Sequence, residues 1–144
     1  MRILRTFIAF ALSVVVTYIL ASSFYTQQVI AKMAAVGAEY SAQQQLNTYA
    51  ANFAGLWQLG AMTAIAFLIA FPVAFAVKRV IKPLAAIAYP AAGAAAILVM
   101  LAAIEQVLGG GAGVIGGARD AVGLSMQALA GFIGGAVFSF SRPR

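Results

Sequence analysis

The side chains that could carry out chemistry are few in this 144-residue chain. It has no histidine and no cysteine, and its only acidic residues are Glu39, Glu105 and Asp120. General acid–base and nucleophilic catalysis need a positioned His, Cys, Lys or carboxylate together with a partner group. Three scattered acids provide neither such a pair nor enough ligands to hold a metal ion. We therefore expect a protein that is not an enzyme and that has no cofactor and no metal site.

Glu105 is the acidic residue that lies inside a long apolar run, about one helical turn from the end of that run. An acid within a membrane segment is by default a functional candidate, such as a proton or cation site. The shallow depth favours a simpler role, because a carboxylate near the end of a span can reach the interface or pair with Arg119 or Lys32. The sequence leaves both interpretations open.

The overall composition indicates a membrane protein. The chain is 64% hydrophobic and 8% charged, whereas soluble domains contain about 25% charged residues. Such an apolar surface needs lipid as its solvent, so the lipid bilayer is the first expected partner. The net charge of +6 could attract nucleic acid, but the basic residues form short clusters at the ends of apolar runs. Without a basic stripe interleaved with aromatic residues, we expect no nucleic-acid binding.

Four apolar runs are long enough to cross a bilayer as helices, since about 20 residues span its hydrocarbon core. They cover residues 3–24, 59–77, 84–108 and 121–140. The first run also fits a signal peptide, because basic residues precede it and small residues follow it; a retained helix is the favoured interpretation. The predicted fold is an all-α integral membrane protein, a single domain over residues 1–144 with four transmembrane helices arranged as two antiparallel hairpins.

The basic residues predict the orientation of these spans. With four spans, the first side of the membrane holds Arg2, Arg5, Lys78, Arg79, Lys82, Arg142 and Arg144, and the second side holds Lys32 and Arg119. Because cytoplasmic loops of membrane proteins carry an excess of Lys and Arg, both termini are expected in the cytoplasm. The alanine-rich composition without cysteine favours a bacterial plasma (inner) membrane.

Two prolines lie at similar predicted depth in neighbouring spans. Pro72 and Pro90 flank a short basic turn, which should make the second and third spans antiparallel neighbours. Proline lacks an N–H, so each would leave the carbonyl four residues earlier without its usual donor. Tyr89 could donate to one of these carbonyls or to water. Interrupted helices at matched depth can indicate a transport site, but proline kinks are also ordinary in membrane helices.

The last span has a face of small and polar residues at helical spacing. The face contains Asp120, Gly123, Gln127, Gly131, Gly134 and Phe138, and Gly131 forms a GxxxG pair with Gly135. Small side chains let helix backbones approach closely in a membrane, so this face is expected to pack on protein. The spacing leaves open whether that protein is another span of this chain or a second copy. Asp120 is also placed to cap the N-terminus of the span.

Residues 26–57 separate the first two apolar runs, and their apolar residues continue the helical spacing of both. The spacing loses phase between Gly37 and Gln45, where Ser41 could start a new helix as its N-cap. We expect the first two spans to continue outside the membrane as a helical hairpin that turns near residues 38–45. The alternative is a helix lying flat on the interface, which the scarcity of Lys and Arg disfavours.

The predicted hairpin offers a surface to which another protein could bind. Its apolar and aromatic candidates are Met33, Tyr40, Leu46, Tyr49 and Phe53. Together with the small-residue faces and the lack of catalytic groups, this surface favours a non-catalytic membrane protein that acts by association, as an accessory, assembly or scaffold subunit of a membrane complex. The alternative is a small homo-oligomeric channel or carrier, motivated by the paired prolines, Glu105 and Gln127.

Overall fold

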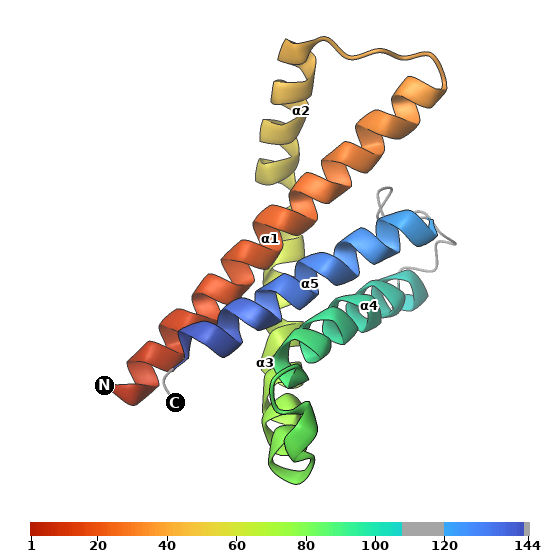
Figure 1. Ribbon diagram of the computed structural model, residues 1–144. Coiled ribbons are helices and arrows are strands. Elements are labelled where there is room, and N and C mark those ends of the chain that lie inside the picture. The colour runs from red at the N-terminus through yellow and green to blue at the C-terminus, as the bar shows by residue number, and fades with distance from the viewer. Residues whose placement is uncertain (108–119, 143–144) are drawn as a thin grey trace.

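The computed structural model describes residues 1–107 and 120–142, and the regular elements in these ranges are all helical (Figure 1). They are α1 (Arg2–Ala35), α2 (Ala42–Gly55), α3 (Trp57–Val80), the 3₁₀ turn η1 (Lys82–Leu84), α4 (Ala88–Val107) and α5 (Ala121–Ser141). The all-helical class expected from the sequence is confirmed. Arg119 and Arg144, which contributed to the predicted orientation, lie outside the described residues, as does the predicted end of the third span at residue 108.

Four of these helices, α1, α3, α4 and α5, are long and apolar enough to cross a membrane. The longest is α1, whose 34 residues correspond to about 50 Å at 1.5 Å per residue, more than the roughly 30 Å hydrocarbon core of a bilayer. Large apolar side chains cover the outside of the bundle; on α3, for example, Leu68, Ile69 and Val73 are each more than half exposed. Such a surface is expected for helices that are solvated by lipid.

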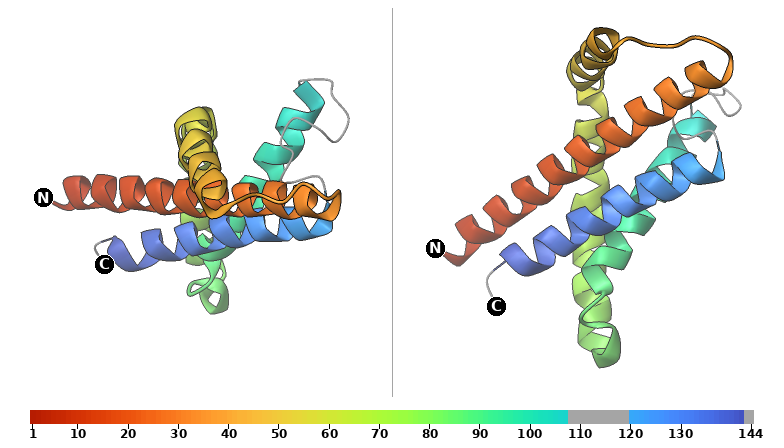
Figure 2. Two further views of the ribbon diagram at one scale, coloured as in Figure 1. Left: turned by 90° about the horizontal axis from the view of Figure 1, so that it is seen from above. Right: turned by 45° about the horizontal axis from the view of Figure 1, so that its top comes forward.

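Helix α5 is the centre of the arrangement. It runs antiparallel to α1 on one side and to α4 on the other, while α3 packs on α4 and crosses α1 (Figures 1 and 2). The helices α4 and α5 form the most extensive contact, and α1 packs more extensively on α5 than on α3. The start of α1 and the end of α5 lie near each other in every view, so both described chain ends belong to the same end of the bundle.

The segment between the first two apolar runs is helical on both sides of a short turn. Helix α1 continues to Ala35, beyond its predicted span, and α2 follows after the turn. The hydroxyl of Ser41 accepts a hydrogen bond from the N–H of Gln44, whose side chain accepts one from the N–H of Ser41, so the two form a capping box. The predicted Ser41 cap is confirmed. The expected continuous helix into the second span is wrong, because Leu56 ends α2 and precedes α3 with non-helical geometry.

The two prolines have different structural roles. Pro72 lies inside α3, whereas Pro90 is the third residue of α4. The turn between these helices is longer than predicted, since η1 is followed by further turn residues and α4 begins at Ala88 instead of residue 84. The N–H groups in the first turn of a helix have no acceptor within that helix, so Pro90 interrupts nothing. The expectation of two helices broken at matched depth is therefore wrong.

Aromatic rings fill the core where α1, α3, α4 and α5 meet. Phe71 is the central ring: its centroid lies 4.7 Å from that of Phe67 and 4.4 Å from that of Phe138, with both pairs stacked. The same ring meets Phe10 of α1 and Tyr89 of α4 edge-on. Aromatic pairs of this kind contribute about 0.5–1.5 kcal/mol each beyond the area they bury. One side chain of α3 therefore joins all four long helices.

Candidate functional site

The buried polar side chains link helices to each other. Ser13 of α1 donates from Oγ to the carbonyl oxygen of Gly134 in α5 at 2.7 Å. Gln127 of α5 donates from Nε2 to the carbonyl oxygen of Ala21 in α1 at 3.0 Å. Both donor side chains are at most 2% exposed, so these bonds are shielded from solvent. Gln127, a candidate for a polar site within the spans, thus acts as a link between α1 and α5.

Other buried hydroxyls bond within their own helices. Thr17, Thr26 and Thr63 each donate to the carbonyl four residues earlier. Among the described residues, Ser22 Oγ is the one buried side-chain polar atom that has no hydrogen-bond partner. The polar groups inside the bundle are therefore used mainly for internal hydrogen bonds.

The small polar face of α1 is a feature that sequence reasoning missed. Its buried residues Ala9, Ser13, Thr17 and Ala21 are spaced four residues apart. That spacing of small residues is the signal that could have identified the face, because it allows close packing of membrane helices. The opposing position on α5 is Gly134, where a Cβ would lie 1.8 Å from Thr17 Oγ1. Glycine at this position is what lets α5 approach the hydroxyl-bearing face of α1.

On its other side, α5 packs against α4 through glycines of both helices. A Cβ at Gly131 would lie 2.4 Å from the carbonyl oxygen of Gly93. A Cβ at Gly135 would lie 2.1 Å from the carbonyl oxygen of Tyr89. Carbon atoms do not approach backbone oxygens so closely, so both positions require glycine. The GxxxG pair is therefore covered by α4 of the same chain, which answers the question of whether it faces another span or a second copy.

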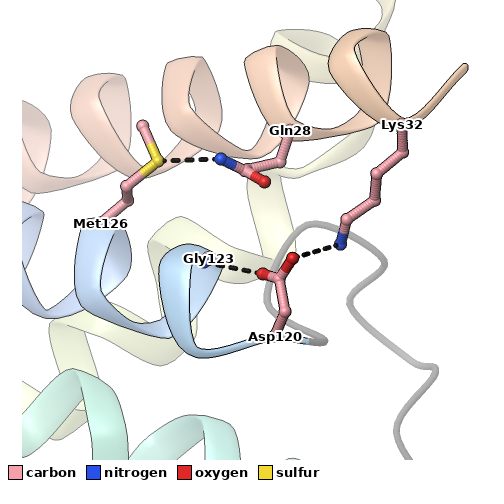
Figure 3. Close-up of polar contacts among 5 residues, drawn as sticks. All are labelled: Gln28, Lys32, Asp120, Gly123 and Met126. Atoms are coloured by element: carbon pink, nitrogen blue, oxygen red, sulfur yellow. Dashed lines mark hydrogen bonds and ion pairs between the residues drawn. The ribbon is translucent and has the colours of Figure 1, made fainter. Parts of the chain in front are cut away.

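The far end of α1 is joined to the start of α5 (Figure 3). Asp120 caps α5 by accepting a hydrogen bond from the N–H of Gly123 at 2.8 Å, and its other carboxylate oxygen lies 3.5 Å from Lys32 Nζ in an ion pair. Gln28 Nε2 donates to Met126 Sδ at 3.1 Å. The predicted Asp120 cap is confirmed. Helix α1 therefore lies beside α5 as far as Lys32.

Helix α2 has no buried residue. Its C-terminal half is attached to α1, where Tyr18 Oη donates to the carbonyl oxygen of Phe53 and Asn52 Nδ2 donates to Thr26 Oγ1 at 3.0 Å. Its N-terminal half separates from α1, as the wide turn between the two helices shows (Figures 1 and 2). The hairpin is therefore closed near the bundle and open at its tip.

The five candidate partner residues lie in different surroundings. Phe53 packs edge-on against α1, and Tyr40 and Tyr49 are half-buried. Leu46 is 64% exposed and Met33 is 41% exposed. The surface available to a partner is thus centred on the latter two residues, and Phe53 belongs to the attachment of α2.

Glu105 lies in the last turn of α4 and is exposed. Its carboxylate is at the end of the apolar helix, not at its middle. Of its two predicted partners, Arg119 lies outside the described residues, and Lys32 forms an ion pair with Asp120. Glu105, Asp120 and the turn that contains Glu39 all lie at the end of the bundle opposite the chain termini.

The end that carries the chain termini is rich in positive charge, and we call it the basic end. Its described basic residues are Arg2, Arg5, Lys78, Arg79, Lys82 and Arg142. They come from the start of α1, the end of α3, η1 and the end of α5. The three acidic side chains of the chain are at the other end, so the charge is strongly asymmetric along the bundle.

Aromatic rings hold several of these cations in place. Arg142 Nη1 donates to Tyr89 Oη, and Arg142 Cζ lies 4.8 Å from the centroid of that ring. Lys78 Nζ lies 5.4 Å from the same centroid, and Arg79 Cζ lies 5.1 Å from the centroid of Phe75. Cations placed over aromatic faces are stabilised by the ring quadrupole. Tyr89, a candidate donor to a carbonyl near the prolines or to water, accepts a hydrogen bond from Arg142.

A cavity of 540 Å³ opens beside these rings. Phe10, Phe71 and Phe138 form part of its apolar wall, and Arg2 and Arg142 also line it. We call it the basic-end cavity. It combines an aromatic surface from the core with two guanidinium groups, from opposite ends of the chain.

A second cavity, of 630 Å³, lies between α3 and α4. Apolar residues line it throughout, including Met62 and Ile69 of α3 and Ala92 and Val99 of α4. The two helices meet at the basic end and diverge toward the other end (Figure 1), which leaves this space between them. It has no polar group that could orient a ligand.

Comparison with models of known protein families, with curated proteins and with solved structures finds no match for this chain. The geometry of the helices and cavities is therefore the basis for assigning a function.

Proposed function

We propose that this protein is a non-catalytic membrane protein that acts by association, as an accessory, assembly or scaffold subunit of a membrane complex. Helices α1, α3, α4 and α5 cross a bacterial plasma membrane, and both termini face the cytoplasm. The basic end supports this orientation, because the cytoplasmic ends of membrane helices carry the excess of Lys and Arg. In this orientation, α2 and the turn before it lie on the outer side.

The observation that carries the proposal is the exposure of α2. The helix is capped by Ser41, yet none of its 14 residues is buried. Isolated helices shorter than about 12–15 residues are marginal in water, because most helical stability in proteins comes from packing of one face. A partner protein that covers the face around Leu46 would supply packing for the N-terminal half of α2, which separates from α1 (Figures 1 and 2).

Affinity purification of the full chain in mild detergent tests this proposal. We expect a second protein to co-purify at constant stoichiometry with the wild type. Leu46→Glu should abolish its recovery, because it places a charge in the apolar contact. Ala51→Glu is the matched control: it adds the same charge at an exposed site of α2, five residues further and thus on another side of the helix. Wild-type protein that repeatedly purifies alone, or equal recovery with both variants, would reject the proposal.

The second candidate function is a homo-oligomeric channel or carrier. It ranks lower because Gln127, one of its polar candidates, is bonded to α1 within the chain, and Glu105 lies at the end of α4. The same purification would reveal it as oligomers of this chain alone. Ion or solute flux into liposomes above that of empty vesicles, reduced by Glu105→Gln, would then favour it over the association role.

A further inference from the structure

We propose that the basic-end cavity binds one anionic phospholipid, with the phosphate group between Arg2 and Arg142 and the first part of the acyl chains against the aromatic wall. This inference rests on the proposed membrane orientation. It does not depend on a protein partner, and it concerns the opposite end of the bundle from α2.

The size and lining of the cavity fit an amphipathic ligand. Its 540 Å³ lies within the range of about 300–1,000 Å³ that is typical of ligand sites. Phe7, Leu68 and Phe75 line it in addition to the core rings, and Phe7 and Leu68 are each more than 60% exposed. Apolar side chains thus extend from the core to the lipid-facing surface. An acyl chain could follow this surface into the cavity without losing its apolar surroundings.

The charges around the cavity fit a phosphate. Arg2 and Arg142 line it, and Lys78 and Arg79 lie over rings at its margin. Lys78 Nζ, Arg79 Cζ and Arg142 Cζ lie 5.5, 5.1 and 5.9 Å from the centroid of the same Phe75 ring. These like charges repel each other, and the acidic side chains of the protein are at the other end of the bundle (Figure 1). A bound anion would offset that repulsion. Guanidinium groups also match phosphate oxygens with paired, charge-assisted hydrogen bonds.

The location of the cavity specifies the source of the phosphate. In the proposed orientation, the cavity lies where the cytoplasmic leaflet meets water, and it opens both to lipid and to the basic end. Basic pockets between membrane helices on this side bind anionic lipid headgroups. The combination of an apolar wall with two arginines therefore favours a phospholipid of the same leaflet.

Native mass spectrometry of the purified full chain tests the proposal. The protein is incubated with equal amounts of phosphatidylglycerol and phosphatidylethanolamine that carry the same acyl chains. We expect one phosphatidylglycerol to be retained in preference to phosphatidylethanolamine. In the double variant Arg2→Gln, Arg142→Gln the affinity for phosphatidylglycerol should fall about tenfold or more, since each basic group near an anionic lipid contributes substantially to binding.

The control variant Arg5→Gln, Lys82→Gln removes two charges from the same end at exposed positions that do not line the cavity. It should retain phosphatidylglycerol nearly as well as the wild type. Equal losses in both double variants would overturn the proposal, because they would indicate diffuse attraction to the basic end.

A third variant, Thr6→Trp, keeps every charge and fills the cavity, because Thr6 lines it and its side chain is exposed. It should also lose the bound lipid; full retention would place the lipid elsewhere and overturn the proposal. Failure of the lipid assay leaves the co-purification result for α2 unaffected, and the reverse also holds, so the two ideas fail separately.

Discussion

Helix α5 contacts α4 on one side and α1 on the other, and the two contacts are built differently. Toward α4, backbone meets backbone: the positions that a Cβ would occupy at Gly131 and Gly135 are filled by the carbonyl groups of Gly93 and Tyr89 in α4. Toward α1, the nearest neighbour is a side chain: Thr17 Oγ1 fills the space beside Gly134, and the Ser13 hydroxyl donates to the Gly134 carbonyl.

The difference shows two ways of bringing membrane helices together without a hydrophobic driving force between them. Backbone-on-backbone packing gains many close contacts but tolerates no added atom. Hydroxyl-mediated packing is as close, since a Cβ at Gly134 would lie 1.8 Å from Thr17 Oγ1, but it adds hydrogen bonds. The atom in the way belongs to a single side chain, which a substitution can remove. The α4 side should therefore respond to mutation as a rigid contact and the α1 side as an adjustable one.

The largest expected effect is on the α4 side. Gly131→Ala should lower the free energy of unfolding by about 3 kcal/mol, the upper part of the usual range for overpacking, because its Cβ meets backbone. Gly134→Ala should also destabilise the protein, but Thr17→Ala should recover part of that loss by removing the clashing hydroxyl. Denaturant titration in mixed micelles would measure the free energy of unfolding of Gly131→Ala, Gly134→Ala, Thr17→Ala and the double variant Gly134→Ala, Thr17→Ala.

The control for this comparison is Ile97→Ala combined with Gly131→Ala. A Cβ at position 131 would lie 2.7 Å from Ile97 Cγ1, its nearest side-chain atom, and 2.4 Å from the carbonyl oxygen of Gly93. Adding Ile97→Ala should therefore recover none of the free energy of unfolding that Gly131→Ala loses. If Thr17→Ala and Ile97→Ala both restored stability to their glycine variants, or if neither did, the distinction between a backbone contact and a side-chain contact would be contradicted.

An intermediate effect is expected from two serines on α1. Ser13→Ala removes the bond to Gly134 and should cost about 0.5–1 kcal/mol, since hydrogen bonds between membrane helices average near 0.6 kcal/mol. Ser22→Ala changes the same atoms at an equally buried site, but Ser22 Oγ has no partner within the described residues. That variant should be neutral or slightly stabilising in the same titration. A cost at Ser22 equal to that at Ser13 would argue against the hydroxyl-mediated contact.

The smallest effect concerns Asp120, which joins α5 to α1 at their exposed end. The N–H of Gly123, ahead of the Lys32 ammonium, holds the pKa of the Asp120 carboxyl below its usual value, against an opposing effect of desolvation. Because the pKa of Asp120 is lower in the folded state, its contribution to stability is complete above the ordinary carboxyl pKa. That contribution is lost as the pH falls through the folded-state pKa, so stability should depend on Asp120 ionisation only below about pH 4.

Asp120→Asn separates the helix cap that Asp120 provides from its ion pair with Lys32. Asparagine is an equally good N-cap, but it cannot form the ion pair or titrate. Below about pH 4, the stability of the variant should fall less with decreasing pH than that of the wild type. At neutral pH its stability should change little, because the Lys32 and Asp120 side chains are 39% and 47% exposed and exposed ion pairs contribute little. Thermal unfolding followed from pH 2 to 7 would measure this; an unchanged acid profile would assign the sensitivity to other groups.

Local features of the chain were predictable because they depend on nearby residues. The Ser41 capping box and the Asp120 cap follow from residue types within one turn of each helix start. The Pro90 prediction failed for a local reason as well: proline is compatible with the first turn of a helix as well as with a kink, and composition did not reveal where α4 begins. The break at Leu56 was hidden because apolar spacing continued through it.

The sequence by itself determined four long apolar helices, the positive charge of one end and the helical character of residues 26–57, because composition and spacing act through each segment separately. Only the tertiary structure decided which faces meet. Several faces carry small residues, on α1, α4 and α5, and lipid offers no preference among their pairings. The choice depends on close approaches between helices: a Cβ at Gly131 would lie 2.4 Å from the Gly93 carbonyl oxygen, and a Cβ at Gly134 would lie 1.8 Å from Thr17 Oγ1. It also depends on Phe71, whose contacts with three other helices require all four to be in place.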